Sequence, residues 1–298
     1  MKYLTSSEVS SKWNLSERSV RNYCTKGRVV GALLKGKTWL IPENANKPER
    51  QTRHMKKRKN LLAVLIDEKE SQTMGGIYHK LQVEMTYNSN HIEGSKLSFD
   101  QTRYIYETMT IGVDDSSVNV DDIIETVNHF RCVDLAIESA KYKLTESLIK
   151  QFHFILKTGT SDSRKSWIKI GDYKMMENEI GGADTCPVAE VKSRLVKLLD
   201  KYNSKKNVSI EDIIEFHYEF EKIHPFQDGN GRVGRLIMLK ECLKHNIVPM
   251  IITDKLKMYY YRGLKEYKEE KVYLVDTCLY AQDIVKTYLD YFKIDYND

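Results

Sequence analysis

The 298-residue sequence lacks paired cysteines and long apolar runs. Its five cysteines are scattered and odd in number, and no two have CxxC spacing, which argues against a disulfide framework and against a zinc site. No apolar run approaches the roughly 20 residues that a membrane span requires, and the N-terminus lacks the apolar stretch of a secretory signal. We therefore expect a cytoplasmic protein with reduced thiols and no membrane contact.

Positive charge is concentrated at the N-terminus. Residues 1–60 contain 15 Lys and Arg against 4 Asp and Glu, a balance of +11, whereas the remainder contains 32 against 38, a balance of −6. A basic end on an otherwise acidic chain is typical of a segment that binds a polyanion, and a solubilising arm would have the same composition. Charge alone leaves both interpretations open.

The first 48 residues have the pattern of a small winged helix-turn-helix domain. The segment from Thr5 to Glu8 has capping-box spacing at the start of one helix, and Ser16 caps a second helix. Two short strands at 29–30 and 38–41 would then form a hairpin. Helix, turn, helix and hairpin in this order predict the winged arrangement.

The segments Gly27-Arg28-Val29-Val30-Gly31-Ala32 and Trp39-Leu40-Ile41-Pro42 resemble the small excisionase-like winged-helix modules. The resemblance implies a DNA contact. Arg18, Arg21 and Asn22 would face solvent and the major groove, while Lys35 and Lys37 on the wing would touch phosphate. The alternative is a protein-interaction module, because the same fold serves both purposes.

A basic linker over 49–59 separates this domain from a second one over 60–298. Periodicity in the second domain is mainly helical, which predicts an all-α domain. The expected helices cover 61–93, 121–141, 144–156, 188–202, 210–224 and 231–245. The segment 171–187 contains three glycines and no helical stripe, and we expect it to form a short β-hairpin flap.

A glycine-rich turn joins two apolar helices after residue 224. Asp228-Gly229-Asn230-Gly231 brings backbone N–H groups together at a helix N-terminus, where the helix dipole favours a phosphate. Arg232 and Arg235 lie on one face of the first helical turn and would fork onto phosphoryl oxygens. Asp228 offers a hard oxygen ligand for Mg²⁺, which bridges phosphates using one or two protein carboxylates. The turn therefore predicts a nucleoside triphosphate site.

A histidine stands at the mouth of this turn. Because an unperturbed histidine has a pKa of about 6.5, His224 suits the work of a general base on an incoming hydroxyl, and it is the candidate catalytic residue. The alternative is that His224 only caps its helix and that the turn is an ordinary corner between two helices. The combination of phosphate-binding and basic residues in one short stretch favours the functional interpretation.

The stretch from His224 to Arg235 matches in full the HPFx(D/E)GNGRxxR signature, so the sequence resembles Fic-domain proteins, and the likeness extends over about 60–290. The resemblance implies an all-α Fic fold and transfer of AMP from ATP-Mg²⁺ to a Ser, Thr or Tyr hydroxyl of a protein. It makes His224 the base, Phe226 a buried anchor and Asp228 the Mg²⁺ ligand. The ATP-binding residues that it implies in this stretch are Gly229, Asn230, Gly231, Arg232 and Arg235.

Two departures from the family pattern concern the flap and the nucleotide. Lys174 stands where an arginine is common, and Tyr267 and Lys268 stand where some relatives have an asparagine beside the adenine. Tyr260 and Tyr261 would stack near the base, although aromatic residues at helical spacing are more often part of a core. The nucleotide is therefore less firmly implied than the reaction.

An upstream segment, Ser89-Asn90-His91-Ile92-Glu93-Gly94, resembles the (S/T)xxxE(G/N) inhibitory motif of Fic proteins and ends a helix near residue 94. The resemblance implies that Glu93 pairs with Arg235 and removes it from the γ-phosphate, which leaves the enzyme inhibited at rest. Ser89 lies on the same helix face as Glu93. In some relatives the glutamate positions water that removes AMP, so a bifunctional enzyme is the alternative.

The flap would hold the target. Gly171, Asp172, Tyr173 and Lys174 begin it, and its main chain would pair with an extended segment of the target. Such docking tolerates many sequences, so the target is another protein or this chain itself. A different hypothesis makes the chain a DNA-binding regulator whose Fic domain only senses ATP.

Overall fold

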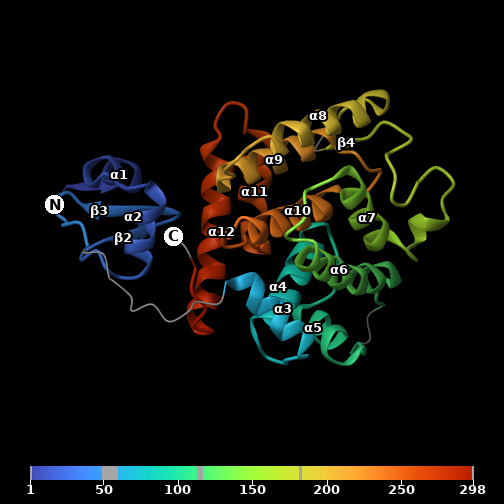
Figure 1. Cartoon of the computed structure of the whole chain (residues 1–298), viewed down its shortest axis with the longest axis horizontal. Coiled ribbons are helices and arrows are strands. Elements are labelled where there is room, and N and C mark those ends of the chain that lie inside the picture. Colours follow the sequence, from blue (N-terminus) through green and yellow to red (C-terminus); the bar gives the residue numbers. More distant parts are fainter. Residues whose placement is uncertain (1, 49–59, 113–116, 181–182, 297–298) are drawn as a thin grey trace. The chain divides into compact units, whose positions relative to one another are not determined.

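The structure, a computed structural model of the chain, describes residues 2–48, 60–112, 117–180 and 183–296. The chain divides into two units, the first built from 1–58 with 296–298 and the second from 59–295 (Figure 1). Each unit is described by itself. The predicted basic linker, 49–59, lies outside the described residues.

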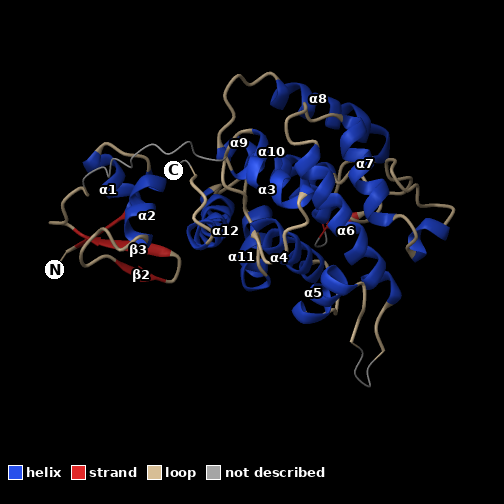
Figure 2. Cartoon of the chain, turned by 60° about the horizontal axis from the view of Figure 1, so that its bottom comes forward, coloured by secondary structure: helices blue, strands red, loops and turns tan. Residues whose placement is uncertain are grey.

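The first unit combines two helices with a small sheet (Figure 2). In chain order its elements are β1 (Tyr3–Thr5), α1 (Ser6–Trp13), α2 (Glu17–Thr25), β2 (Leu33–Lys35) and β3 (Thr38–Pro42), and the antiparallel sheet has the order β1-β3-β2. The predicted capping box is confirmed, since the side chains of Thr5 and Glu8 each accept from the other's backbone N–H. Strand β1 was not predicted, and the winged-helix interpretation stays a prediction.

Two details of the first unit differ from expectation. No strand forms at 29–30, because Val29 O accepts the N–H of Ala32 (3.2 Å) in a turn, and the strand begins only at Leu33. Arg21 and Asn22 are only 3% and 4% exposed, so the expectation that they face solvent was wrong. Arg18 and Lys37 are partly exposed and Lys35 is fully exposed.

The second unit is helical apart from a short hairpin, as predicted (Figure 2). Its helices are α3 (Leu61–Glu70), α4 (Ile77–Ile92), α5 (Phe99–Thr108), α6 (Val120–Glu138), α7 (Glu146–Lys157), α8 (Val191–Asn203), α9 (Ile210–Ile223), α10 (Asn230–Lys244), α11 (Lys257–Lys265) and α12 (Val272–Tyr291). Single 3₁₀ turns lie at η1 (Ser161–Arg164), η2 (Val188–Glu190) and η3 (Asp254–Leu256), and the flap hairpin pairs β4 (Glu179–Ile180) with β5 (Ala183–Asp184). Within the described ranges, no helix has both the length and the apolar character to cross a membrane.

Helix α10 is the centre of the second unit (Figure 1). It is buried on all sides, since even its polar residues Arg232, Arg235, Lys240 and Glu241 are almost inaccessible. Helices α4, α6, α7 and α9 all pack against it. The first turn of α10 therefore meets side chains from several directions, and this is where the sequence predicts the site.

The region predicted as one helix over 61–93 is broken into α3 and α4. Gln72 and Gly75 both have positive φ (51° and 76°), and Gly76 caps α4 without a side chain. A Cβ at Gly76 would overlap with the carboxylate of Glu68, which accepts the N–H of Tyr78 (2.8 Å). The break makes α4 a separate helix whose C-terminal end is directed at α10.

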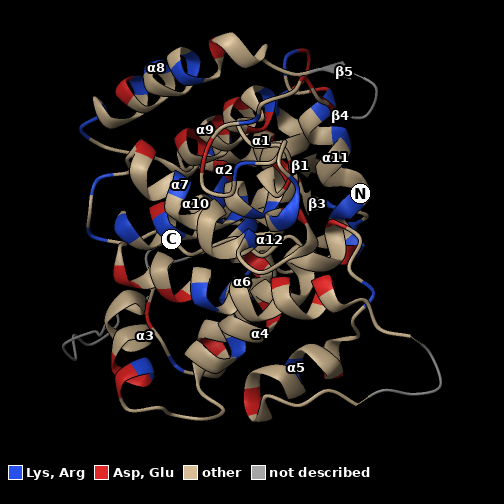
Figure 3. Cartoon of the chain, turned by 90° about the vertical axis from the view of Figure 1, so that its right-hand side faces the viewer, with Lys and Arg blue, Asp and Glu red and all other residues tan. Residues whose placement is uncertain are grey.

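Outer helices of the second unit carry both signs of charge, as α8 illustrates (Figure 3). Its first turns carry Lys192, Arg194 and Lys197, and Asp200 follows. Arg194 also pairs with Glu190 (2.6 Å) just before the helix. With Lys201, α8 carries four Lys and Arg against one Asp, so the helix itself is mainly basic.

Candidate active site

The loop between α9 and α10 has a backbone that only a few residue types tolerate. His224 ends α9 with φ 48°, a left-handed conformation that is rare for residues other than glycine. Gly229 has φ 81° and precedes α10, and its carbonyl accepts the N–H of Val233 (3.0 Å). The loop therefore reverses the chain between two left-handed positions and leaves the N-terminus of α10 open at residues 229–231.

Asn230 and Phe226 fix the shape of this loop. The Asn230 side chain accepts the N–H of Phe226 and donates to its carbonyl, each at 2.8 Å. The Phe226 ring is fully buried and stacks on His153, with 4.0 Å between ring centroids. Phe226 is thus an anchor, as expected, whereas the Asn230 amide serves the loop itself, so its backbone N–H is the group that faces an anion.

His224 has the protonation state that a base requires. Its Nδ1–H donates to Glu221 O (3.3 Å), which leaves Nε2 as the acceptor. Burial lowers the pKa of His224 to about 4, and the carbonyl of Glu221 only partly opposes this shift. The imidazole is therefore neutral at physiological pH.

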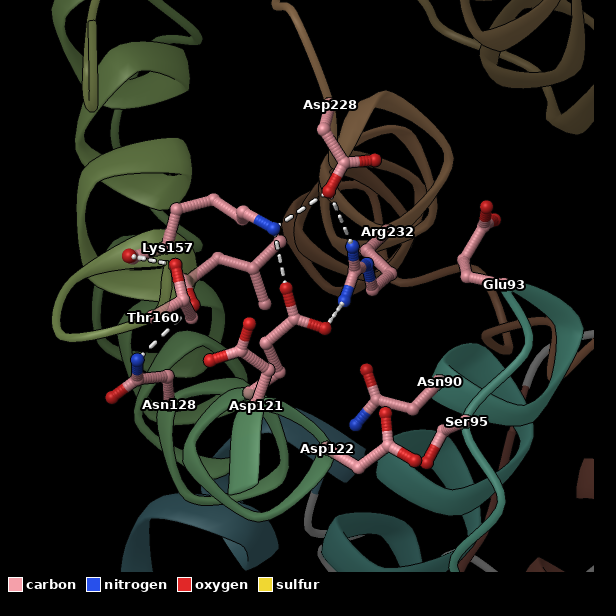
Figure 4. Close-up of polar contacts among 12 residues, drawn as sticks. Asn90, Glu93, Ser95, Asp121, Asp122, Asn128, Lys157, Thr160, Asp228 and Arg232 are labelled. Atoms are coloured by element: carbon pink, nitrogen blue, oxygen red, sulfur yellow. Dashed lines mark hydrogen bonds and ion pairs between the residues drawn. The ribbon is translucent and has the colours of Figure 1, made fainter. Parts of the chain in front are cut away.

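Asp228, Lys157 and Arg232 (Figure 4) form one network of alternating charge together with Glu125. Lys157 Nζ lies 2.6 Å from Asp228 Oδ2 and 2.5 Å from Glu125 Oε1. Arg232 pairs with the other oxygen of Glu125 and lies 3.3 Å from Asp228 Oδ2. Although burial opposes it, Arg232 and Lys157 hold the pKa of Asp228 well below its usual range. Asp228 is thus ionised and available as a ligand.

Arg235 is held by the end of α4. Its Nη2 lies 2.7 Å from Glu93 Oε1 and donates to Ser89 O (2.9 Å), while its Nε donates to Ser89 Oγ (3.0 Å). The guanidinium is buried. A Cβ at Gly231 would overlap with the Glu93 carboxylate, so the glycine lets α4 approach this closely. The pairing of Glu93 with Arg235 that the sequence resemblance implies is present in the structure.

The two predicted adenine-side tyrosines occupy different environments. Tyr260 is buried and its hydroxyl lies 2.5 Å from His217 Nε2, so it is a core residue, the alternative that the sequence left open. Tyr261 is partly exposed, and its hydroxyl donates to Ile92 O (3.1 Å) at the end of α4. Tyr261 therefore contacts the segment that carries Glu93.

The start of the flap is tied to the loop. Lys174 is buried, its N–H donates to Pro225 O (2.8 Å), and its Nζ donates to Asn178 Oδ1 (2.7 Å). Asn178 Nδ2 in turn donates to Phe226 O (3.1 Å). Lys174 thus anchors the flap instead of presenting its charge to a target.

The residues just before Lys174 pack on α7. The N–H of Gly171 donates to His153 Nδ1 (2.9 Å), and Asp172 pairs with Lys150 (3.0 Å). The same ammonium lies 3.9 Å from the centroid of the Tyr173 ring. These contacts position the base of the flap, and any main-chain docking falls to the hairpin beyond it.

Sequence reasoning missed several residues of the site. Lys157, Asp162 and Asn178 were not singled out, and neither was Glu221, whose pKa burial raises to about 8. Each comes from a segment far from the loop or carries no local pattern of its own. A lysine at the end of an apolar helix is usually an exposed residue near the helix dipole. Only the fold brings it to Asp228.

The residues present fit Mg²⁺ bound through a nucleotide. Both cationic contacts of Asp228 go to Oδ2, and its other oxygen points away from Lys157 and Arg232 (Figure 4). In the part of the chain that the structure describes, no three His, Cys, Asp or Glu side chains gather as a metal-binding group. A single carboxylate with phosphate ligands is the usual way in which proteins hold Mg²⁺.

Comparison with solved structures places the fold in a known class. The second unit has the fold of a Fic domain-containing signaling protein from Bacteroides thetaiotaomicron, with a TM-score of 0.62 at 22% identity, covering 77% of this chain and 94% of that one. Fic-1 from C. elegans gives a TM-score of 0.62 at 19% identity and covers 78% and 72%. Residues 143–242, about a third of this chain, match the model of the Fic/DOC family.

Curated relatives match part of this chain. Proteins named protein adenylyltransferase Fic from Drosophila willistoni and Drosophila mojavensis are 29% and 28% identical over 187 residues. These matches cover 60% of this chain and 35% of each relative. The chain thus spans about a third of the length of the curated relatives that it matches.

The role of Asn230 in fixing the loop is testable. Asn230→Ala leaves the buried N–H and carbonyl of Phe226 without partners, so it should lower the free energy of unfolding by about 2–4 kcal/mol. Urea unfolding of the second unit measures this loss. The matched control is Asn203→Ala, which removes one bond to Leu144 O and should cost about 1 kcal/mol. Equal losses in the two variants would contradict the assignment.

Proposed function

We propose that the chain is a protein adenylyltransferase that moves AMP from ATP-Mg²⁺ to a Ser, Thr or Tyr hydroxyl of a protein target, including its own chain. The observation that carries the proposal is a neutral His224, with Nε2 as acceptor, beside a helix N-terminus that bears two arginines. The names of the curated relatives support it.

The reaction follows from these positions. The phosphates of ATP would lie at the N-terminus of α10, against the backbone of Gly229 and Gly231 and the side chain of Arg232. His224 Nε2 takes the proton of the target hydroxyl while its oxygen bonds to the α-phosphorus. The bond from that phosphorus to the β-bridging oxygen breaks, and pyrophosphate leaves. Asp228 would hold Mg²⁺, which would supply positive charge to the phosphates.

Glu93 would keep this site inhibited. Arg235 is buried, and its Nε and Nη2 are occupied by Ser89 and Glu93, so a γ-phosphate would have to displace Glu93 to pair with Nη2. Without that contact the triphosphate is not aligned for in-line attack. Release therefore requires Glu93 to give up Arg235 to the nucleotide.

Labelled ATP tests the reaction and its inhibition together. Glu93→Gly should raise incorporation from α-labelled ATP into protein by about ten- to hundredfold, because coupling of a few kcal/mol is lost. Adding His224→Ala should lower that rate by about a hundredfold or more, because the general base is lost.

Three results would count against the proposal. Label from the γ-phosphate alone would indicate phosphotransfer. Equal rates in wild type and Glu93→Gly would contradict the inhibition by Glu93. Unchanged transfer without His224 would contradict its role as the base.

Incubation with a target that already carries AMP tests for a second activity, the removal of AMP. Because the side chain of Glu93 is 29% exposed, it is within reach of water, and release of AMP that depends on Glu93 would make the enzyme bifunctional.

The low pKa of His224 predicts an unusual pH profile. The neutral base persists above a pKa of about 4, so kcat/KM of Glu93→Gly should change less than about twofold between pH 7.5 and pH 5.5 and fall only near pH 4. A histidine with an ordinary pKa would lose about tenfold at pH 5.5. Initial rates with Mg²⁺ in excess measure the profile, and a midpoint near pH 6.5 would show that burial does not shift this group.

We also propose that the first unit binds duplex DNA. The supporting observation is its pair of helices with a three-stranded sheet whose β2–β3 hairpin exposes Lys35. Arg18 and Lys37 remain candidate contacts, whereas Arg21 and Asn22 would first have to become accessible. A protein-interaction module is the alternative.

Salt dependence of DNA binding tests this second proposal. Lys35→Ala/Lys37→Ala in the full chain should weaken binding and reduce the slope of log K against log salt by about 2. The matched control, Lys2→Ala/Lys12→Ala, changes two lysines of the same unit that contact Glu43, and should leave the slope closer to wild type. Absence of any salt-dependent binding by the wild type would leave the interaction module.

A further inference from the structure

We propose that Lys157 is a positioning residue for the metal ligand Asp228, which it holds in one orientation and shields from divalent cations until nucleotide arrives. The inference rests on the proposed function, because that function makes Asp228 the ligand. It is carried by the geometry of one buried ammonium group. Lys157 Nζ lies within 2.7 Å of three carboxylates, those of Asp228, Glu125 and Asp162.

The backbone that carries this ammonium is fixed, and its side chain is packed. Lys157 is the last residue of α7, and Asn128 of α6 donates from Nδ2 to both Leu156 O (3.1 Å) and Thr158 O (2.8 Å). Thr160 Oγ1 donates to the Lys157 carbonyl (2.8 Å). Its side chain is only 4% exposed. Helix α6 therefore holds the lysine in place.

Lys157 determines which oxygen of Asp228 faces outward. Its ammonium and the guanidinium of Arg232 both contact Oδ2, at 2.6 and 3.3 Å, so the shorter contact is the lysine's. The other oxygen points away from both cations, and the side chain is 51% exposed (Figure 4). A carboxylate held by one oxygen offers a single, directed ligand to a metal at the phosphates.

The same lysine weakens the attraction for a free cation. Asp228, Glu125 and Asp162 carry three negative charges. Lys157, Arg232 and Lys165, which pairs with Asp162 at the exposed edge, carry three positive charges, so the group is neutral. Removal of the ammonium leaves one net negative charge beside the outward oxygen. A divalent cation without nucleotide would then bind more tightly, because charge at short range dominates such affinity.

Lys157→Met therefore has two effects of opposite direction. Cation binding without nucleotide should become tighter, on the order of tenfold, from the charge change. Transfer of AMP should become slower, on the order of ten- to hundredfold, because Asp228 loses its orientation. General damage to the site would weaken both, so the opposed directions separate positioning from a merely structural role.

The experiment compares variants in the Glu93→Gly protein. Mn²⁺, titrated without nucleotide and followed by electron paramagnetic resonance, reports cation binding, and kcat and KM for ATP-Mg²⁺ report transfer. Lys157→Met should give tighter Mn²⁺ binding with a lower kcat, and Lys157→Arg should restore both toward the parent. The matched control is Lys165→Met, since Lys165 also pairs with Asp162 (2.6 Å) but at an exposed position. It should change neither.

A charge-balanced variant covers the case in which Lys157→Met does not fold. Lys157→Met/Glu125→Gln restores neutrality, so its Mn²⁺ affinity should match the parent while its kcat stays low. Unchanged Mn²⁺ affinity in a folded Lys157→Met protein, or loss of both binding and transfer in it, would overturn the inference. Asp228→Asn should abolish Mn²⁺ binding, so that the signal of free Mn²⁺ is not reduced, which would locate the cation at Asp228. If the Glu93→Gly parent transfers no AMP, the proposed function fails, and the Mn²⁺ titration still decides the role of Lys157.

Discussion

Two guanidinium groups buried on the first turn of α10 constrain the rest of the second unit. Arg232 and Arg235 are both nearly inaccessible to solvent, and a buried cation is costly unless carboxylates pair with it. Glu125 of α6 pairs with Arg232, and Glu93 at the end of α4 pairs with Arg235. The packing of α4 and α6 on α10 is therefore fixed partly by charges that the proposed reaction uses.

This arrangement makes the proposed inhibited state a state of satisfied buried charge. Glu93 and a phosphate would compete for the same arginine, and each would leave it paired. Gly231 permits both partners, because a side chain there would overlap with the Glu93 carboxylate and would also crowd the N-terminus that faces a phosphate. Activation then needs a change at the end of α4, where the hydroxyl of Tyr261 also holds Ile92 O, without refolding of the catalytic loop.

Local patterns in the sequence carried most of the fold and the core of the site. Short sequence patterns of a few residues predicted the capping box at Thr5, the flap hairpin, and the stretch from His224 to Arg235. Contacts between residues far apart in the sequence have no such local pattern. Lys157 meets Glu125 across 32 positions and Asp228 across 71, and neither spacing marks a lysine as buried. The break before α4 was missed although Gly75 and Gly76 stand at it, because apolar residues continue on both sides of the two glycines.

The fixed loop and the exchangeable charges have separate roles. Asn230 and Phe226 hold the loop from within, and the flap is tied to the same backbone through Lys174 and Asn178. A target paired with the hairpin would therefore be held at a fixed position relative to His224, because few and rigid segments lie between them. The charges around the loop each have a protein partner that a nucleotide or its metal could replace. The proposed chemistry would depend on exchanging these partners within a constant frame, and for this reason we propose that its regulation depends on side chains such as Glu93 and Lys157.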